Sequence, residues 1–350
     1  AEGKKPFVDS TSQKYEQLRH KHLSTRAGVT YVTLEQARNN RLKPDWKAYA
    51  PVKPSFVGVK HFENYPLEEI SRYIDWTFFF HAWKINGKYP AIFDDPLKGK
   101  ESRVLFDDAQ LMLANIMEHN MVQANGVIGF FPAKSTGDSV ELATGNHEHT
   151  LLHFLRNEEE KEPGIPNLSL ADFIAPAETG ISDYIGLFAV TAGKGIEKWV
   201  KQYEEQNDDY NAIMVKILAD RLAEAFAELL HHKVRKEYWG YAKDENLTID
   251  EIIHEGYVGI RPAPGYPACP EHSEKGTIFS LLNANTAGIS LTENYSMYPA
   301  ASVSGYYFAN PDSQYFAISR ISREQVEDYA ARKNLTVKEV EKLLASNLNY

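Results

Sequence analysis

Cysteine is almost absent from this chain of 350 residues, in which Cys269 is the single example. A lone cysteine cannot form an internal disulfide, and a zinc site made of several cysteines is excluded. Chains that rely on no disulfide are typical of a reducing compartment, so the composition predicts a cytoplasmic protein.

Dense basic clusters and long apolar runs are also missing. The formal net charge is −10, and nucleic-acid binding is disfavoured because a DNA or RNA surface needs clustered Lys and Arg. No run of about 18 apolar residues occurs, so we expect no membrane-spanning helix and no membrane partner. The first residues, AEGKKPFVDS, lack an initiator Met and the apolar core of a signal peptide. We therefore expect the chain to be a piece of a longer polypeptide.

Hydrophobic residues make up 43% of the chain, which is enough for a substantial core. Apolar runs bounded by turn residues predict strands at 126–133, 139–144 and 183–193. The turn Pro-Asp-Ser at 311–313 predicts a further hairpin across residues 302–321. Because strands do not alternate regularly with helices, the predicted fold class is α+β with a mostly antiparallel sheet, and not a Rossmann fold.

Residues 1–30 are polar and charged, with only a thin apolar stripe along a possible helix. They predict a linker with a helical arm. Ordered structure is expected to begin near Tyr31, so that residues 31–350 form one domain. Within this domain, residues 107–120 predict an amphipathic helix whose apolar side chains are Leu111, Leu113, Ile116 and Met117.

The longest predicted element is a helix over residues 208–239. Acidic residues at its start and basic residues at its end suit the helix dipole. Apolar side chains fill one face at helical spacing, and Arg221, Glu224 and Glu228 follow the edge of that face. The helix therefore places two carboxylates and a guanidinium group beside a buried surface.

The most unusual segment is the proline-rich loop at residues 259–275, GIRPAPGYPACPEHSEK. Its prolines fix φ and block regular structure, and Gly265 permits a positive φ. The loop is therefore stiff and exposes backbone groups, with Arg261 at one end and Tyr266 in the middle. This arrangement suits a flat polar ligand, and the alternative is a rigid connection between two elements. The residues alone leave both possibilities open.

Two acidic residues have competing explanations. Asp75 lies in the aromatic segment YIDWTFFF, where a carboxylate without a partner is costly to bury. It either binds a ligand or caps a helix or turn. Glu224 either faces a ligand or pairs with Arg221, which lies three residues earlier on the predicted helix. Asp75 and Glu224 together also permit a hydrolase that uses two carboxylates.

Three histidines, His147, His149 and His153, lie close together in HEHTLLH. On a helix, His149 and His153 would share one face. The segment does not follow the HExxH pattern and has no evident fourth ligand, so we expect a solvated loop and no metal site. Residues 190–199 predict a strand, a glycine turn and a helix start, but they match neither common glycine pattern of nucleotide-binding proteins.

Residues 322–345 imitate a DNA-binding helix-turn-helix. Two capping boxes, Ser322 with Gln325 and Thr336 with Glu339, predict two short helices. Acidic residues on both helices would repel phosphate groups, so we expect an ordinary helical hairpin.

Eight segments are long enough to be compared with known families. They are YIDWTFFFHAW (73–83), LADFIAP (170–176), DYIGLFAVTAG (183–193), DDYNAIMVKILADRLAEAFAELLH (208–231), GIRPAPGYPACPEHSEK (259–275), LTENYSMYP (291–299), ASVSGYYFANPDSQYFAI (301–318) and QVEDYAARKNLTVKEVEKLL (325–344). Together they resemble the C-terminal S-adenosylmethionine-binding, or activation, domain of cobalamin-dependent methionine synthase. The resemblance runs from about Val32 to Tyr350, and RPAPGYPACPEH is its most specific motif. Residues 1–30 resemble the end of the preceding cobalamin domain and its linker.

The resemblance implies a single C-shaped domain around a twisted antiparallel sheet flanked by helices. It also implies a methyltransferase component whose ligand is S-adenosylmethionine. In the family, an electron from flavodoxin or a flavoprotein reductase, together with the methyl group of S-adenosylmethionine, restores methylcobalamin from the inert Co(II) state. The implied partners are that electron donor and the cobalamin-binding domain of the same polypeptide. Cobalamin is implied only together with that domain, because no DxHxxG motif occurs here, so the chain alone is not expected to make methionine.

Seven positions match ligand-binding residues of the family. We assign the ligand's carboxylate to Arg261, and its ammonium, ribose or sulfonium to the acidic residues. The two tyrosines would offer aromatic faces and hydroxyl groups near a cation. No catalytic acid or base and no metal ligand is implied. The seven residues are Asp75, Glu224, Glu255, Arg261, Ala263, Tyr266 and Tyr315.

A second hypothesis belongs to a different class of protein. A docking module could hold the cobalamin domain and flavodoxin without any ligand of its own. Specific binding of S-adenosylmethionine that is lost in Arg261→Ala would distinguish the ligand-binding domain from this module.

Overall fold

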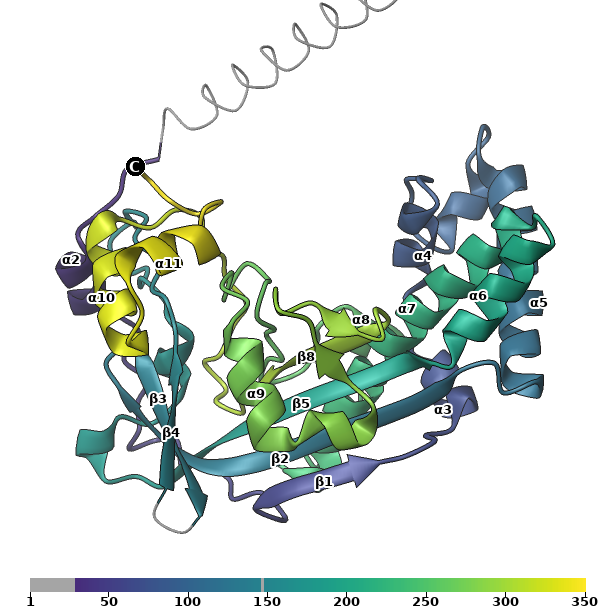
Figure 1. Cartoon of the computed structure of the whole chain (residues 1–350). Coiled ribbons are helices and arrows are strands. Elements are labelled where there is room, and N and C mark those ends of the chain that lie inside the picture. The colour runs from purple at the N-terminus through teal and green to yellow at the C-terminus, as the bar shows by residue number, and fades with distance from the viewer. Residues whose placement is uncertain (1–28, 146–147) are drawn as a thin grey trace, which may run out of the picture.

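The computed structural model describes residues 29–145 and 148–350. The helical arm predicted for residues 1–30 lies almost entirely outside these residues. The described chain is C-shaped, with a curved sheet at its base and a helical arm at each end (Figure 1). One arm contains α4 (Trp76–Ala82), α5 (Gly99–Glu118), α6 (Ile196–Glu205) and much of α7 (Asp209–Lys233). The other contains α2 (Leu34–Asn39), α10 (Arg323–Lys333) and α11 (Val337–Leu343).

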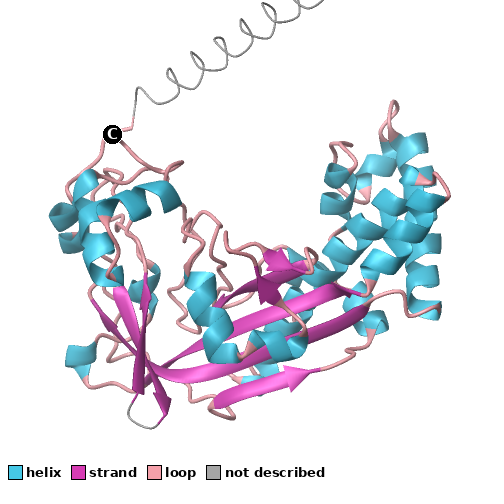
Figure 2. Cartoon of the chain, in the orientation of Figure 1, coloured by secondary structure: helices cyan, strands magenta, loops and turns pink. Residues whose placement is uncertain are grey.

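The sheet is built around two long strands, β2 (Gln123–Thr136) and β5 (Asp183–Lys194), which pair in antiparallel register. The other edge of β2 pairs with β1 (Gly58–Phe62) along its first half and with β3 (Ser139–Gly145) along its second half. The sheet ends at β4 (Glu148–His153) on one side and at β8 (Ser302–Tyr307) on the other. Every pair of neighbouring strands in this sheet is antiparallel (Figure 2). The predicted α+β class is therefore confirmed.

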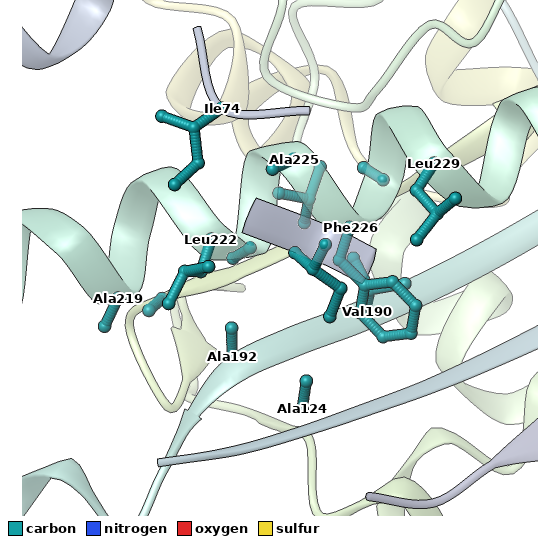
Figure 3. Packing of buried hydrophobic residues seen from close by; sticks show 14 of the residues in the cluster. Ile74, Ala124, Val190, Ala192, Ala219, Leu222, Ala225, Phe226 and Leu229 are labelled. Carbon is teal, nitrogen blue, oxygen red and sulfur yellow. The ribbon is translucent and has the colours of Figure 1, made fainter. Parts of the chain in front are cut away.

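Both faces of β2 and β5 are buried, which explains their continuous apolar sequences. Along β5, Phe188 and Val190 face a core shared with α7, whereas Leu187 and Ala189 face a second core beneath α9 (Glu274–Leu282). Figure 3 shows the first core. Its labelled side chains are Ala124 of β2, Val190 and Ala192 of β5, Ala219, Leu222, Ala225, Phe226 and Leu229 of α7, and Ile74 before α4.

The long helix predicted at 208–239 is confirmed as α7, followed by a π-helical turn at Val234–Tyr238. The helix predicted at 107–120 is confirmed as part of α5, but Leu111 is 71% exposed and does not belong to its buried face. None of the helices in the described part of the chain has the length and apolar character of a membrane span.

The hairpin predicted across residues 302–321 is wrong. Only 302–307 form a strand, β8, and the edge of β8 is occupied by the proline-rich loop. Ile260 exchanges two backbone hydrogen bonds of 3.0 Å with Phe308, and the Tyr306 amide donates to the Pro262 carbonyl at 2.9 Å. Residues 314–321 are therefore diverted to the far side of that loop, where the Ile318 amide donates to the Pro267 carbonyl at 2.8 Å.

The helical hairpin predicted at 322–345 is confirmed as α10 and α11. The capping box of Thr336 and Glu339 is complete. The predicted box at Ser322 forms only half, because the Gln325 side chain instead bonds to both backbone groups of Arg156, accepting from its amide at 2.6 Å and donating to its carbonyl at 3.0 Å. A long-range contact has thus replaced the local one.

The solvated loop expected around the histidines is wrong, because His149 and His153 lie in strand β4. His149 pairs with Glu141 at 2.8 Å, and His153 Nδ1 lies 2.9 Å from the Ser139 hydroxyl. His147 lies outside the described residues. In residues 29–145 and 148–350, no group of three or more His, Cys, Asp or Glu side chains could hold a metal ion.

We expect His153→Gln to flatten the pH dependence of stability between pH 6.5 and 4. Burial, together with the nearby Arg332 and Lys333, lowers the pKa of His153 from 6.5 to about 4. The unfolded chain therefore takes up a proton first as the pH falls, so this contribution to stability is complete above pH 6.5 and is lost towards pH 4. Urea unfolding at pH 7 and 5 measures the effect, and an unchanged slope in the variant would refute it. The exposed His119→Gln is the control.

Candidate functional site

A cavity of about 500 Å³ lies where α7, the proline-rich loop, β8 and the residue before α4 meet. The structure brings every one of the seven residues predicted from the sequence to the wall of this cavity. Eight further wall residues that the sequence did not predict are also polar or aromatic, or belong to the loop, and these are Tyr73, Phe78, Arg221, Glu228, Pro262, Pro267, Ala268 and Phe316.

The proline-rich loop forms one wall through a series of tight turns. The Tyr266 amide donates to the Ala263 carbonyl at 3.0 Å, and the Gly265 amide donates to the Cys269 carbonyl at 2.8 Å. Gly265 has φ 97°, a positive value that glycine permits. The Ala263 amide makes no hydrogen bond to any residue that the structure describes, so it remains a free donor beside the cavity.

Close approach of this loop to β8 depends on Gly305. A Cβ atom added at Gly305 would lie 2.4 Å from the Pro262 carbonyl oxygen and 3.2 Å from the Ala263 Cα. Both contacts are with backbone atoms, which cannot rotate away as a side chain can.

We therefore expect Gly305→Ala to displace the loop, to lower the free energy of unfolding by about 1–3 kcal/mol, and to weaken ligand binding. Gly276→Ala is the matched control, since Gly276 lies in α9 and its added Cβ would meet nothing closer than Tyr295 at 3.6 Å. Denaturant unfolding and calorimetric titration test the pair of variants. Equal behaviour of the two would show that the loop does not need this close approach.

Arg261 and Glu228 form an ion pair inside the cavity wall. Arg261 Nη2 donates to Glu228 Oε2 at 2.5 Å. Burial acts to lower the pKa of Arg261, but the surrounding acidic groups, Glu228 first among them, together outweigh this effect and hold the pKa well above its ordinary value, so the guanidinium stays charged. Arg261 Nε and Glu228 Oε1 are both buried and have no hydrogen-bond partner among the described residues.

Tyr266 and Tyr315 line the same cavity as Arg261. The Tyr315 hydroxyl accepts a hydrogen bond of 3.0 Å from the Arg261 backbone amide. Tyr266 is 54% exposed, and its hydroxyl donates to Glu224 Oε1 at 3.3 Å. The charge of Glu224, followed by burial, raises the pKa of Tyr266 to about 12.

The alternatives left open for the two acidic residues have different outcomes. The helix-capping alternative for Asp75 is confirmed, because its carboxylate accepts from the Thr77 amide at 2.8 Å, and the residue lines the cavity as well. The ion pair of Glu224 with Arg221 is not formed, since Arg221 instead bonds to Asp220 at 2.5 Å.

Glu255 completes the acidic wall from the turn after α8 (Ile249–Ile253). It has a positive φ of 59°, which is unusual for a residue with a side chain. Burial raises the pKa of Glu255, although Arg261 acts in the opposite direction.

The cavity therefore combines four carboxylates, Asp75, Glu224, Glu228 and Glu255, with the guanidinium groups of Arg221 and Arg261. Such a wall suits a ligand that carries a carboxylate as well as cationic or hydroxyl groups. The sequence did not identify Glu228 as a site residue. It lies on the same edge of the helix as Glu224, which precedes it by four residues. That spacing of one helical turn was the signal that could have identified it.

Comparisons with known proteins agree with the resemblance seen in the sequence. Residues 66–334 match the family described as "Vitamin B12 dependent methionine synthase, activation domain". The chain is also similar to a solved structure described as the MetH reactivation domain bound to AdoHcy, with 51% sequence identity and a TM-score of 0.88. The match covers 91% of this chain and 99% of that one.

Proposed function

The chain belongs to the family of activation domains of vitamin B12-dependent methionine synthases, and we propose that its cavity binds S-adenosylmethionine. We further propose that the bound ligand donates its methyl group to cobalamin during reductive reactivation of the synthase. The single observation that carries the proposal is the convergence of the seven predicted residues on one cavity.

The size and chemistry of the cavity support this ligand. A volume of about 500 Å³ lies within the range of pockets that hold small molecules of this size. Arg261 and Glu228 both line the cavity, and each has a buried polar atom, Nε and Oε1, without a partner among the described residues. The similar domain binds AdoHcy, S-adenosylhomocysteine, which is S-adenosylmethionine without its transferred methyl group.

The chain's own residues would bind and orient the ligand. Arg261 provides paired donors for the α-carboxylate, and the free Ala263 amide provides a backbone donor. The acidic wall favours the ammonium, the ribose hydroxyls and the positive sulfonium, and the tyrosine rings flank the cation. Cobalamin, when the neighbouring domain supplies it, would provide the nucleophile that accepts the methyl group. No general acid or base is required of this chain, whose contribution is alignment and exclusion of water.

The implied partners follow from the same proposal. They are the cobalamin-binding domain of the same polypeptide and flavodoxin or a flavoprotein reductase, in the cytoplasm. The chain alone would bind S-adenosylmethionine and would not make methionine. The two-carboxylate hydrolase is less favoured, because Asp75 already accepts a hydrogen bond as the cap of α4.

Calorimetric titration of the chain with S-adenosylmethionine and with AdoHcy tests ligand binding. We expect saturable heat for both, with one site per chain. No heat with either ligand, together with binding of the cobalamin domain, would favour the docking module. The methyl-donation step is tested in the complete synthase by following a labelled methyl group from S-adenosylmethionine onto cobalamin under reducing conditions.

A further inference from the structure

Glu228 differs from the other carboxylates of the cavity in its surroundings. It lies on α7 with only 5% of its surface exposed, and it contributes to the cavity wall. Its Oε2 accepts from Arg261, whereas its Oε1 is buried and has no partner among the described residues. A buried carboxylate oxygen without a donor is costly, so the site is built to receive a donor at this point.

The neighbouring Arg261 is incomplete in the same way. One of its donors reaches Glu228 at 2.5 Å, and its buried Nε has no acceptor. The ion pair thus has an unpartnered acceptor on one residue and an unpartnered donor on the other. An α-amino acid carries its ammonium and its carboxylate on one carbon atom, so a protein that binds both needs an acid and a base that are immediate neighbours.

The other carboxylates of the wall are less suited to this role. Asp75 is engaged with the Thr77 amide, and Glu224 accepts from the Tyr266 hydroxyl at the exposed rim. Glu255 makes no hydrogen bond or ion pair with Arg261 within the described residues. Glu228 is the carboxylate already in contact with the guanidinium group.

We propose that Glu228 Oε1 accepts a hydrogen bond from the ligand's α-ammonium, so that Glu228 and Arg261 together recognise the zwitterionic amino-acid end of the ligand. This inference rests on the proposed binding of S-adenosylmethionine. It makes Glu228 a specificity-determining residue, because removal of the ammonium from the ligand leaves a buried acceptor unpaired.

The test compares AdoHcy with an analogue in which hydrogen replaces the α-amino group. Both ligands lack the sulfonium charge, so the comparison isolates the ammonium. We expect the unmodified chain to prefer AdoHcy by about 100-fold or more. In Glu228→Gln, the affinity for AdoHcy should fall by roughly 30-fold, and the affinity for the deaminated analogue should change by less than about 3-fold. The exposed Glu118→Gln should bind both ligands as the unmodified chain does.

Two results would overturn the inference while leaving the proposed function intact. Equal losses for AdoHcy and the deaminated analogue in Glu228→Gln would mean that Glu228 only positions Arg261. A much larger loss for S-adenosylmethionine than for AdoHcy would mean that Glu228 faces the sulfonium instead. Failure of the unmodified chain to bind AdoHcy would instead refute the proposed function itself.

Glu228→Asp provides the second variant in case the glutamine variant does not fold. It keeps the charge beside Arg261 but withdraws the acceptor by one carbon atom. We expect reduced discrimination between AdoHcy and the deaminated analogue. Undiminished discrimination would contradict the placement of Glu228 Oε1 at the ammonium.

Discussion

Arg261→Ala is expected to weaken binding of S-adenosylmethionine by about 2–5 kcal/mol, which corresponds to a loss of roughly 30-fold or more. The variant removes the paired donors proposed for the ligand's carboxylate. It also leaves Glu228 buried without its cation, since Arg261 Nη2 is the partner of Glu228 Oε2. Calorimetric titration with S-adenosylmethionine measures the change.

Two further variants show which property of Arg261 is needed. Arg261→Lys keeps a positive charge but loses the planar fork, so we expect it to recover part of the folding stability and little of the binding. Arg323→Ala removes an arginine from an exposed ion pair with Glu327 and should bind the ligand normally. Tight binding by Arg261→Ala would contradict the placement of the ligand's carboxylate.

Lys333→Ala is expected to lower the free energy of unfolding by about 3–5 kcal/mol, because it leaves two buried carboxylates without their shared cation. Lys333 Nζ lies 2.8 Å from Glu274 Oε1 and 3.1 Å from Glu271 Oε2, and all three side chains are largely buried. Burial acts to lower the pKa of Lys333, but Glu274 and Glu271 together hold it above its ordinary value. Urea unfolding measures the loss.

The same cluster provides its own control. Combining Lys333→Met with Glu271→Gln and Glu274→Gln removes the buried charges together and should restore much of the stability. The exposed Lys338→Ala on α11 should change the free energy of unfolding by no more than about 0.5 kcal/mol. A small loss in Lys333→Ala itself would mean that water reaches the two carboxylates.

The features predicted well from the sequence are those that local chemistry determines. Helix α7 follows from apolar spacing and charged ends, and the stiffness of the 259–275 loop follows from its prolines and Gly265. The strands β2 and β5 follow from long apolar runs, because both of their faces are buried. These properties belong to one segment at a time and need no knowledge of its neighbours.

Two of the predictions that were wrong involve a partner from far along the chain. Residues 314–321 do not pair with β8 because the loop around Ile260 already occupies that edge. The Gln325 side chain leaves its own helix end to bond with Arg156. Competition of this kind depends on which distant segment arrives at the same place, and no local pattern records it.

The candidate site includes residues that the sequence identified and one residue, Glu228, that it did not. The resemblance identified seven residues that the fold gathers around one cavity, although the residues alone had left the role of Asp75 and Glu224 open. From the sequence, Glu228 could be recognised only as a neighbour of Glu224 on the same edge of the predicted helix. Its contact with Arg261 depends on how the loop crosses α7, which the sequence does not specify.

The walls of the cavity come from points spread over most of the chain, from Tyr73 to Phe316. During synthesis on a ribosome, the helices of the first arm would emerge long before the residues around Tyr315. A nascent chain could therefore fold part of its core before its ligand-binding cavity is complete. Ligand binding would begin only after the residues around Tyr315 had emerged, and bound ligand would then report that the segments from Tyr73 to Phe316 had come together.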